Sequence, residues 1–418
     1  MKNLPADFVQ LMIQHHGDAV TESLCSALLD TEPEVSVRLN TRKIEAHESL
    51  REMVQDILPS IGEAVSWCPD AYYLTERPAF TFDPLFHTGV YYVQEASSMY
   101  VAHLLSQYGP TVPSAALDLC AAPGGKSTLL AGLLPEGSLL LSNEPMPKRA
   151  NILAENMQKW TRMSAGEYPV ASLVANNYPA DFGAFTDCFD VLVTDVPCSG
   201  EGMIRREPNA LNEWKFENRQ MCADRQLKIL NSADKMLKNG GVLVYSTCTL
   251  SQDENEMVID KFIKSHPYYT IEPISAQFGR AGYARFAENE NITNTRRILL
   301  SDGGEGHFVA RLKKCEDTGE NYEILPDENI RNPIFEEFTD ENFAKPLKNI
   351  RINRDSVSVV PCGIPLISGV HILRSGVFAG TLKKNRFEPS HALYMSQKTD
   401  NFKKVLDLQL TDNRIFDY

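Results

Sequence analysis

The feature that most constrains the fold is an alternation of strand-like and helix-like segments between Ala116 and Ser265. Five short segments are apolar almost throughout, at 116–119, 138–144, 170–177, 189–195 and 241–247. Segments with helical spacing of apolar residues follow them at 127–134, 148–160, 214–237 and 254–265. Apolar strands that alternate with helices are typical of a parallel sheet covered on both faces. The sequence therefore predicts an α/β fold, with 268–274 and 307–312 as candidate antiparallel strands at its edge.

Two of the apolar strands are each followed by a cysteine. Cys198 lies three residues past the strand that ends at Asp195, in D-V-P-C-S-G-E-G, and Cys248 directly follows the strand that ends at Thr247. The carboxyl ends of neighbouring parallel strands open into one crevice. A single cysteine at a strand end is more often a small buried hydrophobe than a reactive thiol. Pro197 and the glycines after Cys198 favour a loop at the rim, so we expect both thiols to act on one substrate.

A small, glycine-rich turn, D-L-C-A-A-P-G-G-K from Asp118 to Lys126, separates the first strand from the first helix. Such a turn presents free backbone N–H groups and a positive helix end to a ligand. Glu144 ends the next strand, where nucleotide-binding α/β folds place a carboxylate on ribose hydroxyls. The phosphate-loop pattern fails because Cys120 replaces its first glycine, and the dinucleotide fingerprint is absent. A turn needed only for packing is the plainer interpretation, but Glu144 at this interval favours a bound ligand.

Length and composition indicate an ordinary globular chain of two or three domains, with 418 residues of which 43% are apolar. The first residues lack a basic stretch followed by a long apolar run, and no segment reaches the roughly eighteen apolar residues of a membrane span. We therefore expect a cytoplasmic protein without a membrane segment. The nine cysteines are scattered without C-x-x-C pairs, which predicts reduced thiols and no metal site.

The net charge of −14 is unevenly distributed. Residues 316–341 hold ten acidic side chains against one arginine, a net charge of −9. Residues 346–418 hold eleven basic against six acidic side chains, a net charge of +5. We interpret the acidic stretch as a solvated connector, whereas the basic tail is consistent with either a solvated surface or RNA binding.

Four motifs together carry a family resemblance: D-L-C-A-A-P-G-G-K, N-E at 143–144, D-V-P-C-S-G-E-G and S-T-C-T-L-S-Q-D-E-N-E. In this order they closely resemble the Sun/nucleolar-protein family of RNA cytosine-5 methyltransferases, which use S-adenosylmethionine. R-L-N-T at 38–41, Y-Y-V-Q-E-A-S-S at 91–98 and G-E-G-H-F-V-A at 304–310 extend the resemblance. The segment from Gly380 to Leu393 is similar to the PUA-like RNA-binding domain of RsmF/YebU-like enzymes, which methylate 16S ribosomal RNA.

The resemblance implies a Rossmann-like class I methyltransferase sheet flanked by two smaller domains. We expect an N-terminal α+β domain for RNA binding at 1–90, with helices over its first 35 residues, and a catalytic domain at 91–315 that begins with a helix at 91–105. An acidic linker at 316–345 and a PUA-like RNA-binding domain at 346–418 complete the expected organisation.

The resemblance also implies unequal roles for the two thiols. The thiolate of Cys248 attacks C6 of cytosine and makes C5 nucleophilic, and Cys198 helps to release the product, as a general base or through water. Asp195 hydrogen-bonds N3 and the amino group of the cytosine. Because a paired cytosine cannot reach such a pocket, an unpaired or extruded nucleotide is expected.

The resemblance implies cofactor contacts at the matching positions, whereas the candidate RNA contacts are basic residues. The cofactor residues implied are Cys120, Ala121, Ala122, Pro123, Gly124, Gly125, Lys126, Glu144, Asp195 and, for the adenine, Asn177 with Asn176 as the alternative. Candidate phosphate contacts are Arg205, Arg206, Lys383, Lys384 and Arg386, with Phe387 for stacking. The implied partner is 16S rRNA or the small ribosomal subunit, and we expect a monomer.

Other functions remain alternatives at this stage. A ribosome-assembly factor that binds RNA and only retains the fold would have no use for both thiols, Asp195 and the glycine-rich turn together. Transfer RNA is an alternative substrate for the same reaction. DNA cytosine methylation is disfavoured, because the enzymes of that class attack from the cysteine after proline and lack the second one.

Overall fold

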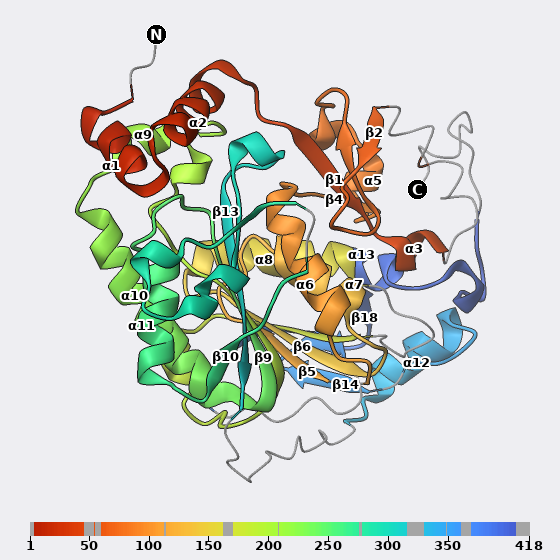
Figure 1. Cartoon of the computed structure of the whole chain (residues 1–418). Coiled ribbons are helices and arrows are strands. Elements are labelled where there is room, and N and C mark those ends of the chain that lie inside the picture. The colour runs from red at the N-terminus through yellow and green to blue at the C-terminus, as the bar shows by residue number, and fades with distance from the viewer. Residues whose placement is uncertain are drawn as a thin grey trace.

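A ten-stranded mixed sheet lies at the centre of the protein in its computed structural model (Figure 1). Five of its strands are parallel neighbours in the order β7, β6, β5, β8 and β9. They are β5 (Ala115–Asp118), β6 (Ser138–Asn143), β7 (Val170–Ala175), β8 (Phe189–Asp195) and β9 (Leu237–Thr247), which confirms the predicted α/β fold. The structure describes residues 4–45, 54, 60–112, 114–161, 170–207, 209–275, 278–315, 330–347, 349–360 and 369–406.

Antiparallel strands extend both ends of this sheet. β13 (His307–Lys314) pairs with β9, and β12 (Arg296–Ile298) and β10 (Tyr269–Ile271) pair with β13. β11 (Arg280–Ala281) pairs with β12, and at the opposite end β16 (Ile372–Ser375) pairs with β7. The antiparallel direction of β13 and β10 agrees with the prediction. β13 is not an edge strand, however, because β12 continues the sheet although two of its three residues are arginines.

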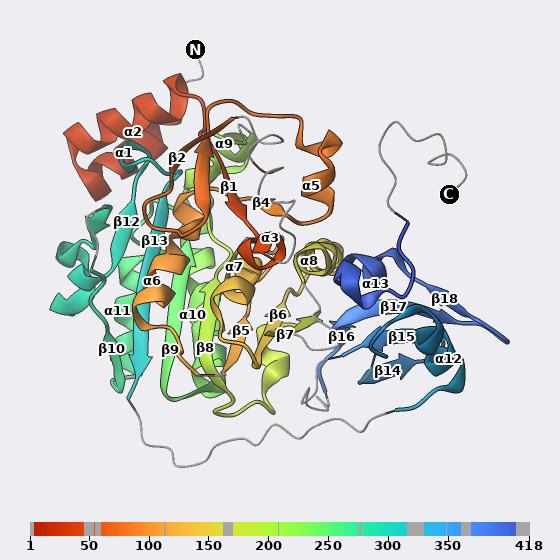
Figure 2. The ribbon, with the colours of Figure 1, turned by 90° about the vertical axis from the view of Figure 1, so that its right-hand side faces the viewer.

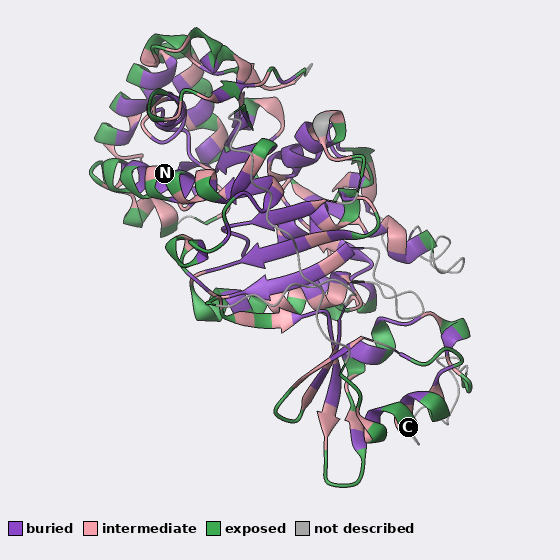
Figure 3. Ribbon diagram, turned by 90° about the horizontal axis from the view of Figure 1, so that it is seen from below, coloured by how far each residue is buried: buried purple, intermediate pink, exposed green. Residues whose placement is uncertain are grey.

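Helices cover both faces of the central sheet (Figure 2), and its strands are largely buried (Figure 3). One face carries α6 (Tyr100–Tyr108), α7 (Gly125–Leu133) and α8 (Pro147–Trp160), and the other carries α10 (Asn218–Met236) and α11 (Glu256–Ser265). Successive strand residues enter opposite cores: Leu192 packs with α10 and α11, whereas Val193 packs with α6 and α7. This two-sided burial explains why the strands read as continuous apolar runs.

The segment 91–105, predicted as one helix, contains a strand, a short 3-10 turn and the start of a helix. The strand β4 (Tyr91–Val93) and the turn η2 (Ser97–Met99) precede α6. In β4, Val93 lies opposite Val37 of β1, so a partner more than fifty residues away decides the conformation of this segment. The N-terminal sheet therefore extends beyond residue 90.

The N-terminal part contains a separate four-stranded sheet in the order β2, β3, β1, β4. Its elements are β1 (Val35–Leu39), β2 (Ile61–Ala64), β3 (Ala71–Leu74), α3 (Thr41–Glu45) and α5 (Pro84–His87). The helices α1 (Ala6–His16) and α2 (Asp18–Asp30), confirmed as helical, do not join the core of this sheet. Phe8 and Leu24 pack with Leu250 and Leu300 instead, so the first helices support the loop that follows Cys248.

The C-terminal part forms a third unit with its own core. It consists of α12 (Pro333–Asn342), β14 (Ile350–Asn353), β15 (Ser356–Val359), β17 (Val377–Leu382), β18 (Phe387–Pro389) and α13 (His391–Met395). Residues 316–329 of the expected linker lie outside the described residues. The rest is not a linker, since Phe335 of α12 is buried with its ring 5.0 Å from that of Phe387. Phe387 is itself buried, so its expected stacking on RNA is wrong. The PUA-like assignment stays a prediction.

The remaining elements are short: α9 (Asn209–Glu213), η1 (Phe80–Phe82), η3 (Pro179–Phe182), η4 (Glu201–Met203), η5 (Ala284–Phe286), η6 (Glu290–Asn294), η7 (Leu300–Asp302) and η8 (Thr399–Asn401). Within the described ranges, none of the helices combines the length and the apolar character that crossing a membrane requires.

Candidate active site

Cys198 and Cys248 lie side by side beyond the carboxyl ends of β8 and β9. The two strands are parallel neighbours with Asp195 opposite Ser246, so the loops that follow them leave the sheet at the same level. The two Sγ atoms are 3.3 Å apart. The structure therefore brings together the two thiols that the sequence predicts to share a crevice.

A buried carboxylate, that of Glu201, ties the two cysteine loops together. Its Oε2 accepts hydrogen bonds from the Thr249 hydroxyl at 2.6 Å and from the Leu250 N–H at 3.0 Å. Its Oε1 accepts a hydrogen bond from the indole of Trp214 at 3.0 Å. A charge-assisted network of this kind fixes the loop after Cys248 against the loop after Cys198.

Two glycines shape the loop after Cys198. Gly200 has a φ of +73°, which favours glycine. Gly202 donates its N–H to the Cys248 carbonyl at 2.9 Å. A Cβ at this position would lie 2.4, 2.6 and 2.7 Å from the carbonyl oxygens of Glu305, Gly306 and Cys248, so only glycine allows this close approach. The two glycines of S-G-E-G are thus explained by geometry.

A second buried carboxylate, that of Glu254, holds the backbone beside Cys198. Its Oε2 accepts hydrogen bonds from the Ser199 N–H at 3.0 Å and from Gln226 Nε2 at 2.9 Å. Burial, together with the neighbouring charge of Glu201, raises the pKa of Glu254 to about 7. The protonation state of this support therefore changes near neutral pH.

The thiol of Cys198 is shielded by its surroundings. Its hydrogen bond with Cys248, followed by burial and by the charges of Cys248 and Glu254, raises the pKa of Cys198 well above its usual value. Either sulfur can be the donor of the hydrogen bond that joins the two thiols. The two sulfurs therefore lie close enough to act on the same bound group.

Asp195 is an ionised carboxylate held by two partners. Burial acts to raise its pKa, but the Lys126 ammonium, His307 and the hydrogen bond from Ser246 together hold that pKa below its usual value. Lys126 Nζ lies 2.7 Å from Oδ2, and the Ser246 hydroxyl donates to Oδ1 at 2.8 Å. The side chain is still 36% exposed, so a ligand can reach it.

A cavity of about 280 Å³ joins these groups to the glycine-rich turn. The predicted residues that line it are Cys120, Ala121, Ala122, Pro123, Gly125, Lys126, Asp195, Arg206 and Cys248. Gly124, the residue before α7, has a φ of +119°. A Cβ on Gly125 would lie 3.2 Å from the side chain of Gln94. The turn and the Cys248 thiol thus face the same space.

Asp118, at the end of β5, provides a test of the expected cofactor. Its Oδ2 accepts a hydrogen bond from Ser127 at 2.7 Å, whereas its Oδ1 is buried without a partner among the described residues. Burial, with Asp195 nearby, raises the pKa of Asp118 to about 7. An unpartnered buried carboxylate oxygen needs a donor. Asp118 does not line the 280 Å³ cavity, however, so the fit to S-adenosylmethionine rests on the glycine-rich turn, of which Cys120, Ala121, Ala122, Pro123 and Gly125 line it.

Glu144, the expected ribose carboxylate, is buried just past β6. Its Oε1 accepts a hydrogen bond from the Met146 N–H at 3.0 Å, and its Oε2 lies 3.4 Å from Nη1 of Arg149. A carboxylate has about four acceptor sites, so these partners leave acceptors for ligand hydroxyls. Glu144 does not line the 280 Å³ cavity, and its role stays a prediction.

The two candidates for the adenine contact have different surroundings. The amide of Asn177 donates to the His371 carbonyl at 3.1 Å and accepts from the His371 N–H at 2.9 Å. Asn176 donates to the carbonyls of Glu144 and Pro145 at 2.8 and 3.0 Å. Asn177 therefore fastens the C-terminal part of the chain to the end of β7, a role that the sequence does not reveal. Contact of either residue with adenine stays a prediction.

Eight residues outside the predicted set also line the cavity, and three of them are carboxylic acids or histidine: Glu95, Glu305 and His307. Burial lowers the pKa of His307 to about 4, so its ring is neutral. His307 Nδ1 lies 3.8 Å from Oε2 of Glu95, while its Nε2 is buried without a partner among the described residues. All three lie in the motifs Y-Y-V-Q-E-A-S-S and G-E-G-H-F-V-A. The presence of these motifs in the family resemblance was the sequence signal that could have identified them as site residues.

The two arginines after the catalytic loop have different environments. Arg205 is buried and pairs with Glu305 through two contacts of 2.9 and 2.8 Å, while also donating to Thr31 at 2.7 Å. The expected phosphate contact of Arg205 is therefore wrong, because its charge is already neutralised inside the protein. Arg206 lines the cavity, with a side chain that is 28% exposed.

The other three expected phosphate contacts lie at the turn between β17 and β18. Lys383, Lys384 and Arg386 are exposed there. Glu388 of β18 lies 3.7 Å from Lys383 and 2.5 Å from Arg386. This hairpin carries more positive than negative charge, and it lies in a different unit from the cysteines.

Three family descriptions match successive parts of the chain. Residues 108–313 match 16S rRNA methyltransferase RsmB/F, and residues 4–96 match the N-terminal domain of 16S rRNA methyltransferase RsmF. Residues 335–396 match the first C-terminal domain of RsmF rRNA methyltransferase. The third match begins at α12, in agreement with the core that α12 shares with the C-terminal sheet.

Curated relatives named ribosomal RNA small subunit methyltransferase F are similar over much of the chain. The protein from Erwinia tasmaniensis is 33% identical over 289 residues, which cover 67% of this chain and 57% of that protein. The protein from Vibrio atlanticus is 28% identical over 411 residues, covering 91% and 81%. In the first relative, the aligned part thus spans less than two thirds of the length.

Among solved structures, a methyltransferase homologue from Pyrococcus horikoshii is similar in both fold and sequence. It is 27% identical, has a TM-score of 0.60 and covers 73% of this chain and 94% of its own. The shared region supports the same arrangement of central sheet and covering helices.

Proposed function

The chain belongs to the family of 16S rRNA methyltransferases RsmB/F, and we propose that it transfers a methyl group from S-adenosylmethionine to C5 of a cytosine in RNA. The proposed substrate is 16S rRNA or the small ribosomal subunit. One observation carries the proposal: two thiols lie 3.3 Å apart, and one of them, Cys248, lines a cavity that the glycine-rich turn also lines. A cytoplasmic, monomeric enzyme is the form that we propose.

Cys248 is the proposed nucleophile. Its thiolate adds to C6 of the cytosine, and the electron pair of the C5–C6 double bond moves to C5, which becomes nucleophilic. Placement at the end of a buried strand supports this role, since Thr247 and Thr249 on either side are fully buried and hold the thiol in one position. When bound, S-adenosylmethionine supplies the methyl group as an electrophile.

Asp195 is proposed to hold the pyrimidine during the attack. An ionised carboxylate accepts hydrogen bonds from the amino group and from protonated N3, and so stabilises the positive charge that develops there. The lowered pKa of Asp195 and its partial exposure support this role. Lys126 and Ser246 fix the orientation of the carboxylate.

Cys198 is proposed to assist release. After methylation Cys198, directly or through a water molecule, accepts the C5 proton, the C5–C6 double bond re-forms, and the bond from C6 to sulfur breaks, with its electron pair returning to Cys248. The distance of 3.3 Å between the two sulfurs supports this role, because it places Cys198 beside the covalently bound base.

The cofactor is proposed to occupy the glycine-rich turn. Gly125 and Lys126 line the cavity at the start of α7, and Glu144 is proposed to accept the ribose hydroxyls. Arg206 at the cavity, with Lys383, Lys384 and Arg386 on the distant hairpin, is proposed to contact RNA phosphates.

A pair of cysteine variants tests the proposal. Incubated with cofactor and 16S rRNA or small subunits, Cys248→Ala loses activity by about 10³-fold or more and forms no adduct. Cys198→Ala accumulates a covalent RNA–protein complex that resists denaturant. Cys315→Ala, which removes an exposed free thiol, is the matched control and keeps full activity.

The outcomes discriminate between the alternatives. An adduct with Cys248→Ala but not with Cys198→Ala reverses the two roles. Methylation of transfer RNA in place of 16S rRNA changes the substrate but keeps the chemistry. RNA binding without methylation or adduct points to a non-catalytic assembly factor. Bisulfite mapping of rRNA from a deletion strain identifies the modified cytosine.

A further inference from the structure

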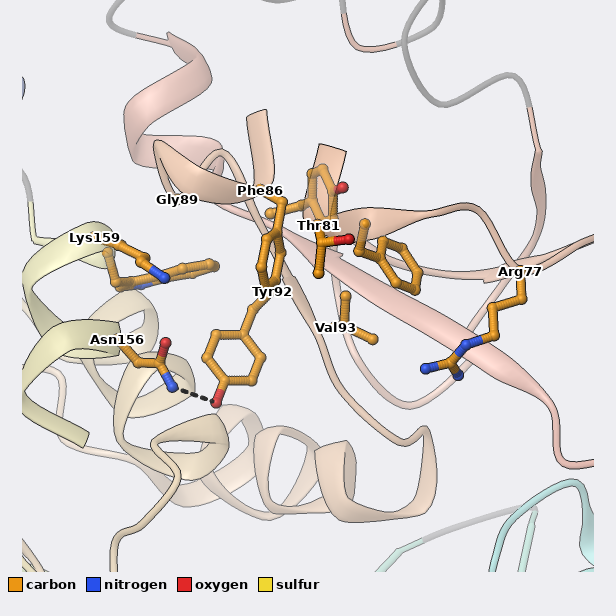
Figure 4. Close-up of a pocket in the computed structure, with 11 residues that line it drawn as sticks. Arg77, Thr81, Phe86, Gly89, Tyr92, Val93, Asn156 and Lys159 are labelled. Carbon is orange, nitrogen blue, oxygen red and sulfur yellow. Dashed lines mark hydrogen bonds between the residues drawn. The ribbon is translucent and has the colours of Figure 1, made fainter. Parts of the chain in front are cut away.

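A second pocket, of about 310 Å³, lies between the N-terminal sheet and the end of α8 (Figure 4). We call it the aromatic pocket, because its lining includes five aromatic side chains: Phe80, Phe86, Tyr91, Tyr92 and Trp160. None of the proposed catalytic steps uses it. Its composition differs from that of the catalytic cavity, where Glu95, Asp195 and Glu305 are present.

The walls of the aromatic pocket are held firmly together. Gly89 has a φ of +69°, and a Cβ there would lie 2.2 Å from the Lys159 carbonyl, so the N-terminal chain touches the backbone of α8. The Asn40 amide donates to the carbonyls of Gly89 and Trp160, both at 3.0 Å. Lys43 Nζ adds hydrogen bonds of 2.6 Å to the carbonyls on both sides, those of Thr88 and Lys159. The pocket is therefore a preformed feature of this junction.

The described lining of the pocket carries positive charge only, although the protein as a whole is acidic. The chain has a net charge of −14, yet the described lining contains Arg77 and Lys159 and no carboxylate. Figure 4 shows these two side chains reaching in from opposite sides. The Arg77 guanidinium lies 5.8 Å from the Phe80 ring, and the Lys159 ammonium lies 5.4 Å from the Phe86 ring. Neither cation has a carboxylate within ion-pair distance among the described residues.

The aromatic pocket adjoins the catalytic cavity. Tyr92 and Val93 line both. Asn156 connects the two spaces: its amide donates to the Tyr92 hydroxyl at 3.5 Å, drawn as the dashed line in Figure 4, and to the Pro123 carbonyl of the glycine-rich turn at 2.8 Å. A ligand in the aromatic pocket is thus separated from a ligand in the catalytic cavity by little more than one side chain.

We propose, on the basis of the proposed function, that the aromatic pocket binds an unpaired nucleotide adjacent to the target cytosine. Its base stacks on the aromatic wall, and its phosphate meets Arg77 and Lys159. Aromatic faces combined with cations and free of carboxylates are the pattern by which proteins bind single-stranded RNA without strict sequence reading. Binding one neighbour outside the stack also helps to present the target base in an unpaired state.

Binding measurements on two kinds of variant test the proposal. The probe is a 16S rRNA oligonucleotide of about 15 nucleotides centred on the cytosine mapped by bisulfite sequencing. Phe86→Leu keeps an apolar side chain but removes the stacking face, and it weakens binding about tenfold. Arg77→Ala/Lys159→Ala leaves the aromatic wall intact and reduces the salt slope of log K by about 0.7 for each lost phosphate contact. The matched control, Lys228→Ala/Lys261→Ala, removes two exposed cations on α10 and α11 and changes neither quantity.

An abasic series locates the bound nucleotide and provides the decisive comparison. Oligonucleotides that lack one base at each position beside the target are bound by wild type and by Phe86→Leu. At one adjacent position, removal of the base lowers the affinity of wild type about tenfold. Combining that abasic oligonucleotide with Phe86→Leu lowers the affinity no further. Equal losses at every position, or unchanged affinity of both pocket variants, overturns the inference. Weaker binding to the assembled small subunit with unchanged binding to the oligonucleotide also overturns it, since a ribosomal protein is then the partner.

Failure of this inference is distinguishable from failure of the proposed function. If wild type methylates the mapped cytosine and Cys198→Ala traps the RNA while the pocket variants bind normally, only the flanking site is wrong. If wild type neither methylates nor forms an adduct with any of the RNAs, both proposals fall. Cofactor affinity, measured in parallel, is unchanged in all pocket variants, which shows that the fold is intact.

Discussion

The two cysteine loops present their thiols 3.3 Å apart but are supported differently. The loop of Cys248 is enclosed: Thr247 and Thr249 are fully buried, and the backbone N–H and carbonyl of Leu250 are both hydrogen-bonded. Its N–H donates to Glu201 at 3.0 Å, and its carbonyl accepts from Arg297 at 2.9 Å. A thiol mounted in this way has a fixed position.

The loop of Cys198 is more open. Residues 197–200 are only partly buried, and their backbone hydrogen bonds include those from Gln226 to the Pro197 carbonyl at 3.0 Å and from the Ser199 N–H to Glu254 at 3.0 Å. The difference matches the proposed chemistry. An attacking sulfur needs accurate placement, whereas a group that assists release needs access to protons and solvent.

The largest effect is expected from removing the buried support of the Cys248 loop. Arg297→Met leaves the Glu256 carboxylate, which is fully buried, without its ion-pair partner. The expected loss is about 3–5 kcal/mol in the free energy of unfolding, measured by urea denaturation. Lys264→Met removes a half-exposed lysine from Asp260, which keeps its hydrogen bonds from the N–H groups of Glu288 and Asn289, so this variant is the control and changes the midpoint little. A small effect of Arg297→Met would mean that the Cys248 loop is not held as rigidly as the contacts indicate.

A smaller effect is expected from separating the loops. Gly202→Ala places a methyl group against three carbonyl oxygens and pushes the Cys198 loop away from Cys248. The expected cost is about 3 kcal/mol of stability from overpacking, with a loss of about 100-fold in methyl transfer from misplacement. Gly132→Ala in α7, where a Cβ meets nothing within 4 Å, serves as the control and keeps full activity. Normal activity of Gly202→Ala would break the proposed coupling of the loops.

A pH-dependent effect is expected at the support of the Cys198 loop. The folded pKa of Glu254, about 7, lies above its ordinary value of 4.5, so the folded protein holds a proton that the unfolded chain releases. The contribution of Glu254 to stability is therefore fully present below pH 4.5 and declines as the pH rises toward 7, by about 3 kcal/mol. Glu254→Gln lacks this titration, so its free energy of unfolding does not show the decline. The difference in unfolding free energy between wild type and variant therefore changes between pH 4.5 and 7. Parallel pH curves for both proteins would contradict the assignment.

The smallest effect on the thiol pair is expected from the distant hairpin. Lys383→Glu/Lys384→Glu lowers RNA affinity and the salt slope of binding, since exposed cations contribute through phosphate contacts. The rate of adduct formation in a Cys198→Ala background, measured at saturating RNA, stays unchanged, as does cofactor affinity. A slower saturated rate would show that the hairpin acts on the chemistry and not only on binding.

The parts of the fold that the sequence predicts are those with local signals. The five parallel strands are apolar because helices cover both faces, so their positions and the cysteines after β8 and β9 follow from the pattern alone. The glycines of the two cysteine loops are also predictable from the sequence. The proposed chemical roles came from the family resemblance, because no local rule distinguishes a thiol that attacks from a thiol that assists release.

The errors arise where a distant partner decides the structure. Arg205 looks like an exposed cation in sequence, but Glu305, a hundred residues later, neutralises it in the interior. Tyr91–Val93 has helical spacing with the residues that follow, yet pairing with β1 makes it a strand. Phe387 stands among basic residues, but α12 covers it. None of these partners lies in the short stretch of sequence from which the corresponding prediction was made.

The pairing of β16 with β7 has a consequence for the order in which the protein is completed during synthesis. β7 ends at Ala175, and the strand that covers its edge begins at Ile372, roughly two hundred residues later. At a translation rate of about 5–20 residues per second, the edge of β7 stays uncovered on the ribosome for roughly 10–40 s. An uncovered edge invites pairing with other strands. The nascent chain therefore passes through an aggregation-prone interval that ends only when β16 emerges.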